Sequence, residues 1–140
     1  MPLRSVTNVL DEYIGWTGTM GGYRSAAVAA RPDKELAQRS CQACKRGTPC
    51  LTADEIEPLA AQLEQGWEVV ELHHLSKTFT FVDFVSALAF VNRLGEVAEA
   101  EGHHPDIHLA WGRVGVEIWT HKIGGLSESD FILAAKADRL

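Results

Sequence analysis

Three histidines in the last third of the chain are the residues best suited to do chemistry. His103 and His104 are adjacent and precede Pro105, and His121 follows later in the sequence. Imidazole is the side chain whose unperturbed pKa lies near neutral pH, so grouped histidines suit proton transfer. We therefore expect acid/base catalysis if the fold brings His103, His104 and His121 together.

The residues around these histidines indicate how they could be positioned. His103 and His104 follow the end of a predicted helix, and Pro105 disfavours helical geometry at His104, so the two rings should point in different directions. Glu99 lies four residues before His103 and is expected to orient that ring. His121 follows a predicted strand whose end returns toward His104 in an antiparallel hairpin. The sequence thus predicts that the three rings meet.

Capping residues and apolar periodicity predict three helices. They begin after Thr52, which heads a Thr-x-x-Glu capping box, after Asp83, and after Ser127. Gly66 is expected to stop the first helix and Gly102 the second, because glycine readily adopts the left-handed conformation that ends helices. The buried stripe of the second helix is expected to comprise Phe84, Ala87, Leu88, Val91 and Ala98.

Alternating apolar and polar residues predict two antiparallel hairpins. The first joins strands at residues 67–72 and 77–82, and the second joins strands at residues 107–111 and 114–118 through a tight turn at Gly112-Arg113. Together the elements follow the order α-β-β-α-β-β-α. This order predicts an α+β fold, in which helices cover one face of a four-stranded antiparallel sheet.

The regular pattern covers only part of the 140 residues, a length that suits one domain. Residues 1–40 show no clear helical or strand period and are expected to be a mobile or loosely packed extension. A transit peptide is the alternative, against which the acidic residues of this segment weigh. Residues 41–50 are expected to be a link, and residues 51–140 the folded domain.

The link contains all three cysteines, Cys41, Cys44 and Cys50, so they cannot staple the rest of the chain. We expect reduced free thiols. Use in a metal or redox site is the alternative, but a closed zinc site needs four ligands, and the nearest histidines, His73 and His74, are distant in sequence.

Composition excludes several classes of function. Hydrophobic residues make up 46% and charged residues 23%, and a net charge of -6 argues against general affinity for nucleic acid or anionic membranes. No apolar run reaches the roughly 18 residues of a membrane span, and the beginning lacks a signal-peptide pattern. We expect a cytoplasmic protein with a small-molecule ligand.

The spacing of these residues resembles that of the pterin-4a-carbinolamine dehydratase family. The family pattern places an acidic residue, His-His-Pro, an aromatic residue, a later His and an Asp at fixed intervals. Every position is filled here, by Glu99, His103-His104-Pro105, Trp111, His121 and Asp130. The resemblance covers about residues 51–140, and nothing of it transfers to residues 1–40.

The resemblance implies dehydration of a 4a-hydroxytetrahydropterin to the quinonoid dihydropterin, in recycling of the pterin cofactor of aromatic amino-acid hydroxylases. This reaction needs an acid at the departing hydroxyl and a base at a nitrogen, but neither a metal nor another cofactor. By resemblance, His103, His104 and His121 are catalytic. His104 would lie nearest the 4a-hydroxyl, with His103 or His121 as the partner base.

The same resemblance implies residues that bind or orient the substrate, namely Glu99, Pro105, Asp106, Trp111 and Thr120. Trp67 is an alternative to Trp111 beside the pterin ring, and Asp130 is expected to be structural rather than directly catalytic. The family also implies a homodimer or homotetramer.

Two other functions stay open. One is a metal hydrolase with three histidine ligands, and the other is a non-catalytic interaction module, because some animal relatives are dimerisation partners of a transcription factor. Retention of all three histidines favours catalysis. His73, His74 and His108 lack the family spacing, so we expect them to be solvated strand residues that can serve as controls.

Overall fold

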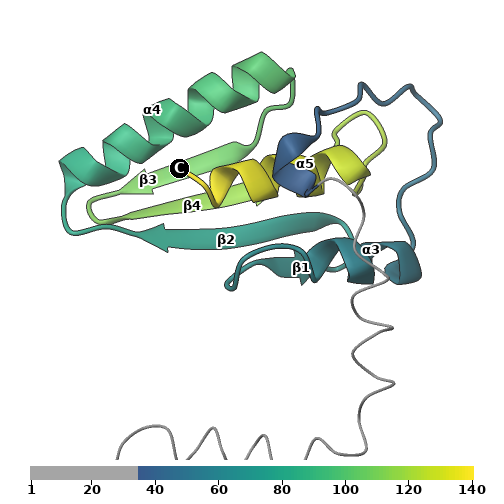
Figure 1. The fold of residues 1–140 in the computed structure, drawn as a ribbon, viewed down its shortest axis with the longest axis horizontal. Helices are drawn as coiled ribbons and strands as arrows, with labels where there is room; N and C mark the ends of the chain where they lie inside the picture. The colour runs from purple at the N-terminus through teal and green to yellow at the C-terminus, as the bar shows by residue number, and fades with distance from the viewer. Residues whose placement is uncertain (1–34) are drawn as a thin grey trace, which may run out of the picture. The chain divides into compact units, whose positions relative to one another are not determined.

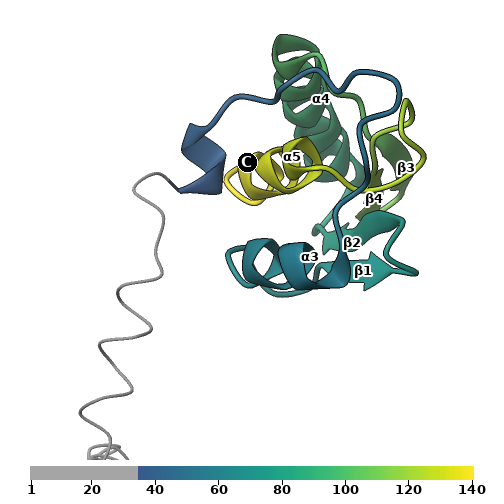
Figure 2. The same ribbon diagram turned by 90° about the vertical axis from the view of Figure 1, so that its right-hand side faces the viewer.

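Three α-helices cover one face of a four-stranded antiparallel sheet in the computed structural model, which describes residues 35–140 (Figures 1 and 2). The strands lie in the order β1-β2-β4-β3 and comprise β1 (Glu68–Val70), β2 (His74–Thr80), β3 (Asp106–Ala110) and β4 (Arg113–Ile118). The helices are η2 (Leu36–Gln38, a short 3-10 helix), α3 (Ala53–Ala60), α4 (Phe84–Glu101) and α5 (Glu128–Ala137). The predicted α+β class and sheet are confirmed.

Each α-helix begins at its predicted cap. Asp83 accepts a hydrogen bond from the Ser86 amide at 2.8 Å, and capping boxes start α3 and α5. Gly102, at φ 62°, ends α4 as expected. The end of α3 was predicted too late, because the chain tightens after Ala60 into turns whose amides bond three residues back, before it reaches Gly66.

The first hairpin begins its second strand earlier than predicted. β2 starts at His74, where it pairs with Val70, and the His73 amide donates to the Val70 carbonyl at 2.9 Å to close the turn. The two central turn residues, Glu71 and Leu72, have φ values of 51° and 55°. This left-handed pair is the geometry that fits the twist of a tight hairpin, although Asn and Gly adopt it more easily.

The turn of the second hairpin is shifted by one residue from its predicted place. Ala110 pairs with Arg113, so Trp111 and Gly112 form the turn and Arg113 belongs to β4. The Phe81 amide donates to the Gly112 carbonyl at 2.8 Å. A Cβ at Gly112 would lie 3.0 Å from the Phe81 carbonyl oxygen, which accounts for glycine at this close approach.

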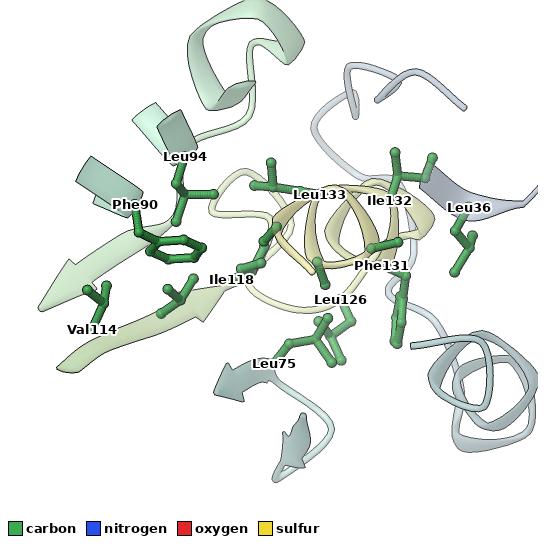
Figure 3. Packing of buried hydrophobic residues seen from close by; sticks show 14 of the residues in the cluster. Leu36, Leu75, Phe90, Leu94, Val114, Ile118, Leu126, Phe131, Ile132 and Leu133 are labelled. Atoms are coloured by element: carbon green, nitrogen blue, oxygen red, sulfur yellow. The ribbon is translucent and has the colours of Figure 1, made fainter. Parts of the chain in front are cut away.

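The core lies between the sheet and the helices (Figure 3). The predicted stripe of α4 was partly wrong: Phe84 and Leu88 are 43% and 39% exposed, whereas the buried residues are Ala87, Phe90, Leu94 and Ala98. Because α4 carries apolar residues on more than one side, periodicity alone did not determine which side faces the sheet.

The last helix is the most buried, and η2 packs against it. Leu36 of η2 is 2% exposed and joins Ile132 and Phe131 in the core (Figure 3). The predicted extension over residues 1–40 therefore falls mainly on residues 1–34, outside the described residues, while Leu36 belongs to the domain. Among residues 35–140, no helix is long and apolar enough to span a membrane.

Candidate active site

A pocket of about 350 Å³ lies where the end of α4, the end of β4 and the segment at residues 41–44 come together. Its lining contains all three predicted histidines, His103, His104 and His121. The other lining residues are Cys41, Gln42, Ala43, Cys44, Glu101, Gly102, Trp119, Thr120 and Lys122. The structure thus brings the three rings to one site from a helix end and a strand end.

His103 is fixed by a buried carboxylate. Its Nε2 lies 2.5 Å from Oδ1 of Asp130, whose side chain is fully buried, while the His103 side chain is 15% exposed. The second oxygen of Asp130 accepts from the Ser127 amide at 2.7 Å and from the Thr120 hydroxyl at 2.9 Å. Each oxygen of Asp130 therefore has a partner, and this network links the first turn of α5 to His103 and to the end of β4.

His104 is held differently, at the exposed rim of the site. Its Nε2 lies 2.9 Å from Oε2 of Glu99, and the two side chains are 62% and 83% exposed. The prediction that Glu99 orients His103 was wrong. The left-handed Gly102 turns the chain and the His103 amide bonds to the Ala98 carbonyl, so the four-residue helical spacing does not extend to His103.

His121 is exposed and packs against an aromatic ring. The ring centroids of His121 and Trp119 are 4.3 Å apart, with 50° between the planes. Trp119 also contacts His73 and His74, at 5.7 Å and 6.0 Å between centroids. Two of the three histidines expected to be solvated controls, His73 and His74, therefore contact a residue that lines the pocket.

The segment at residues 41–44 closes one side of the pocket and is bonded to α4 and α5. The Cys41 amide donates to Glu101 at 2.7 Å, and Glu101 also pairs with Lys136. The Gln42 amide donates to the Ser129 hydroxyl at 2.9 Å, and that hydroxyl donates to the Gln42 carbonyl at 3.0 Å. The segment expected to be a link is thus part of the pocket wall.

The surroundings of this segment shift the pKa values of two ionisable groups. Burial, with the Glu101 carboxylate next in importance, raises the pKa of the Cys41 thiol to about 12. Hydrogen bonds from Lys136 and from the Cys41 amide lower the pKa of Glu101 below its usual 4.5. The thiol therefore stays neutral and the carboxylate ionised at neutral pH. All three cysteines are free.

The substrate-binding residues predicted from the resemblance divide into two groups. Thr120, 6% exposed, lines the pocket and bonds to Asp130. Glu99, Pro105, Asp106 and Trp111 do not line it. Trp111 is 69% exposed in the β3–β4 turn, at the opposite end of the hairpin from the pocket.

The alternative tryptophan, Trp67, also lies away from the pocket lining. Its indole donates to Asp138 at 3.0 Å, and it packs edge-on against Phe79. Sequence reasoning missed Trp119, the contact from Asp130 to His103, and the segment at residues 41–44. Of these, only Asp130 had a signal, as the last residue of the Ser127-x-x-Asp130 cap and as a position of the family pattern. Within residues 35–140, no cluster of three His, Cys, Asp or Glu side chains is arranged to hold a metal.

Comparison with known proteins gives one consistent result. The sequence model of the family described as pterin 4 alpha carbinolamine dehydratase matches residues 49–140. A candidate pterin-4-alpha-carbinolamine dehydratase of Rubrobacter xylanophilus is 57% identical over 106 residues, which are 76% of this chain and 98% of that protein. One of Alkaliphilus metalliredigens is 50% identical over 104 residues, which are 74% of this chain and 94% of that protein.

A solved structure agrees with this comparison. The transcriptional coactivator/pterin dehydratase from Brucella melitensis superposes with a TM-score of 0.61 at 32% sequence identity. The superposition covers 64% of this chain and 96% of that one.

Proposed function

The chain belongs to the pterin 4 alpha carbinolamine dehydratase family, and we propose that it dehydrates a 4a-hydroxytetrahydropterin to the quinonoid dihydropterin by histidine acid/base catalysis. The observation that carries this proposal is the pocket that His103, His104 and His121 line together. Recycling of the pterin cofactor of a hydroxylase, in the cytoplasm, is the physiological role that we infer from the family.

His103 is proposed as the base. A carboxylate only accepts hydrogen bonds, so the His103 nitrogen that faces Asp130 carries a hydrogen, and in the neutral ring the other nitrogen, Nδ1, is left to accept a proton. The buried carboxylate also stabilises the imidazolium that forms when Nδ1 takes the substrate's nitrogen proton. Thr120 and Ser127 hold Asp130 in place for this role.

His104 and His121 are proposed to act at the departing hydroxyl. His104 donates a proton as the bond from carbon to the 4a-oxygen breaks, so the oxygen leaves as water, and His121 positions that oxygen. Net proton balance is kept because the proton given to the hydroxyl is matched by the one that His103 takes from nitrogen.

The proposed reaction uses no metal, so turnover should survive complete treatment with a chelator. Loss of turnover that zinc restores would favour the metal hydrolase instead.

The test is a dehydration assay on a 4a-hydroxytetrahydropterin, with the uncatalysed rate subtracted because a carbinolamine also breaks down in water. We expect His103→Ala to lower turnover on the order of 10²–10⁴-fold, the range for loss of a general acid or base. His108→Ala is the matched control, because His108 is exposed on β3 and outside the pocket lining. Equal losses in both variants at equal stability, or no loss in either, would overturn the proposal.

We also propose that the protein is a homo-oligomer, as in its family. The first turns of α4 and the segment before it expose large apolar side chains, with Val82 81% and Val85 73% exposed, beside the exposed Phe84 and Leu88. Grouped exposed apolar residues are typical of interaction surfaces. Val85→Glu should therefore reduce the mass measured by analytical ultracentrifugation, and an unchanged mass would contradict this interface.

A further inference from the structure

We propose that Trp119, supported by the His73–His74 pair, is a positioning residue that holds the His121 ring in the pocket. This inference rests on the proposed function and assigns residues that lie outside the family spacing. His121 differs from the other two histidines of the pocket in what holds it. His103 bonds to Asp130 and His104 bonds to Glu99.

Among the described residues, the His121 side chain makes no hydrogen bond, and its closest aromatic neighbour is Trp119, at 4.3 Å between ring centroids. The backbone on each side of His121 is anchored, because the Thr120 amide donates to Gly125 at 2.9 Å and the Gly124 amide donates to Thr120 at 3.0 Å. The anchored backbone fixes where the side chain starts but leaves its torsions free. The indole of Trp119 is the group that limits the orientation of the ring.

Trp119 is itself held by contacts across the sheet. His73 and His74 pack on it, and their Nδ1 atoms lie 3.1 Å apart, within hydrogen-bonding distance of each other. Four rings thus form one continuous cluster that runs from the β1–β2 turn to the pocket. The His73–His74 pair and His121 therefore both pack on Trp119, so the pair can influence the orientation of His121 through the Trp119 ring.

The turn that places His73 has an uncommon backbone. Glu71 and Leu72 both have positive φ, a conformation that L residues other than Asn, Asp and Gly rarely adopt. The pair forms the tight turn between β1 and β2, which places His73 beside Trp119.

The experiment is a double-mutant cycle on kcat and KM of the full-length protein, with Trp119→Ala, His121→Ala and the double variant. We expect Trp119→Ala to lower kcat about tenfold, since a misplaced catalytic group loses its alignment. His121→Ala should lower it by on the order of 10²-fold. If Trp119 acts through His121, removing Trp119 should cost almost nothing more when His121 is already absent.

Three further variants separate the positioning role from a loss of folding. Trp119→Phe retains a ring and should keep kcat within about threefold of wild type, which separates loss of the ring from loss of folding. The double variant His73→Ala/His74→Ala should lower kcat, but by less than Trp119→Ala does. His108→Ala, on the same sheet but outside the cluster, should leave kcat unchanged. Full additivity in the cycle, or a wild-type kcat for Trp119→Ala, would overturn the inference.

A second readout does not depend on turnover. The indole ring current should displace the NMR signals of the His121 ring protons, and Trp119→Ala should return them toward the values of a free imidazole. Unchanged shifts would count against the positioning role even if the assay showed no dehydratase activity. Inactivity of the wild-type protein, with the shift change present, would instead overturn only the proposed function.

Discussion

The adjacent residues His103 and His104 are held by two different kinds of contact. His103 pairs with Asp130, which is fully buried, whereas His104 pairs with Glu99, which is 83% exposed. A charged hydrogen bond is stronger where water is excluded, while an exposed ion pair contributes little. One ring of the pair is therefore fixed by the folding of the core, and the other remains free to adjust at the rim.

Because of this difference, we expect Asp130 to matter more than Glu99 for both stability and turnover. Asp130 also bonds to Thr120 and Ser127, so its loss would leave buried polar groups without partners. Glu99 has His104 as its hydrogen-bond partner among the described residues, and water can replace it. Three substitutions follow, from the largest expected effect to the smallest, and the first and last of them, Asp130→Ala and Glu99→Gln, test this contrast directly.

The largest effect is expected from Asp130→Ala. The variant should lose about 3 kcal/mol of unfolding free energy, because the Ser127 amide, the Thr120 hydroxyl and His103 lose their shared acceptor. Turnover should fall on the order of 10²-fold or more at a temperature where the variant is still folded. Urea unfolding and the dehydration assay measure the two effects. A variant as stable as wild type would show that the buried network does not fix His103.

A smaller, pH-dependent effect is expected from Glu101→Gln, which weakens the attachment of the segment at residues 41–44. The folded-state pKa of Glu101 is below 4.5, so the ionised carboxylate stabilises the fold above that pH. This contribution is lost as the pH falls through the lower, folded-state value. The difference in Tm between wild type and the variant should therefore be present at pH 7 and shrink toward pH 3.

The corresponding control is Glu128→Gln, because Glu128 pairs with Arg39 at an exposed position and has no bond to residues 41–44. Its Tm should stay close to that of wild type at both pH values. A Tm difference for Glu101→Gln that is the same at pH 7 and pH 3 would contradict the assigned role of the ionised carboxylate.

The sequence predicted the elements of the site better than the contacts between them. Cap residues such as Asp83 and Gly102 act locally, so they indicated where α4 begins and ends. Asp130 was readable as the end of a capping box, but its other oxygen contacts a ring 27 residues away, which no local pattern encodes. The segment at residues 41–44 was missed for the same reason, since Gln42 bonds to Ser129.

The face of α4 and the role of Trp119 were also beyond local patterns. Apolar residues occur on several sides of α4, so the choice of Phe90 and Leu94 for the core depends on packing against the sheet. Trp119 precedes the matched Thr120-His121 pair, but only the register between β2 and β4, with Leu75 opposite Ile118, brings the end of β4 next to His74.

The smallest effect is expected from Glu99→Gln. Both side chains of the His104–Glu99 pair are largely exposed, so stability should stay within about 0.5 kcal/mol of wild type. Turnover should fall less than tenfold, because the amide still accepts a hydrogen bond from His104. A fall as large as that of Asp130→Ala would show that the exposed partner orients its histidine as strongly as the buried one. The difference in burial would then not determine which histidine depends on its carboxylate.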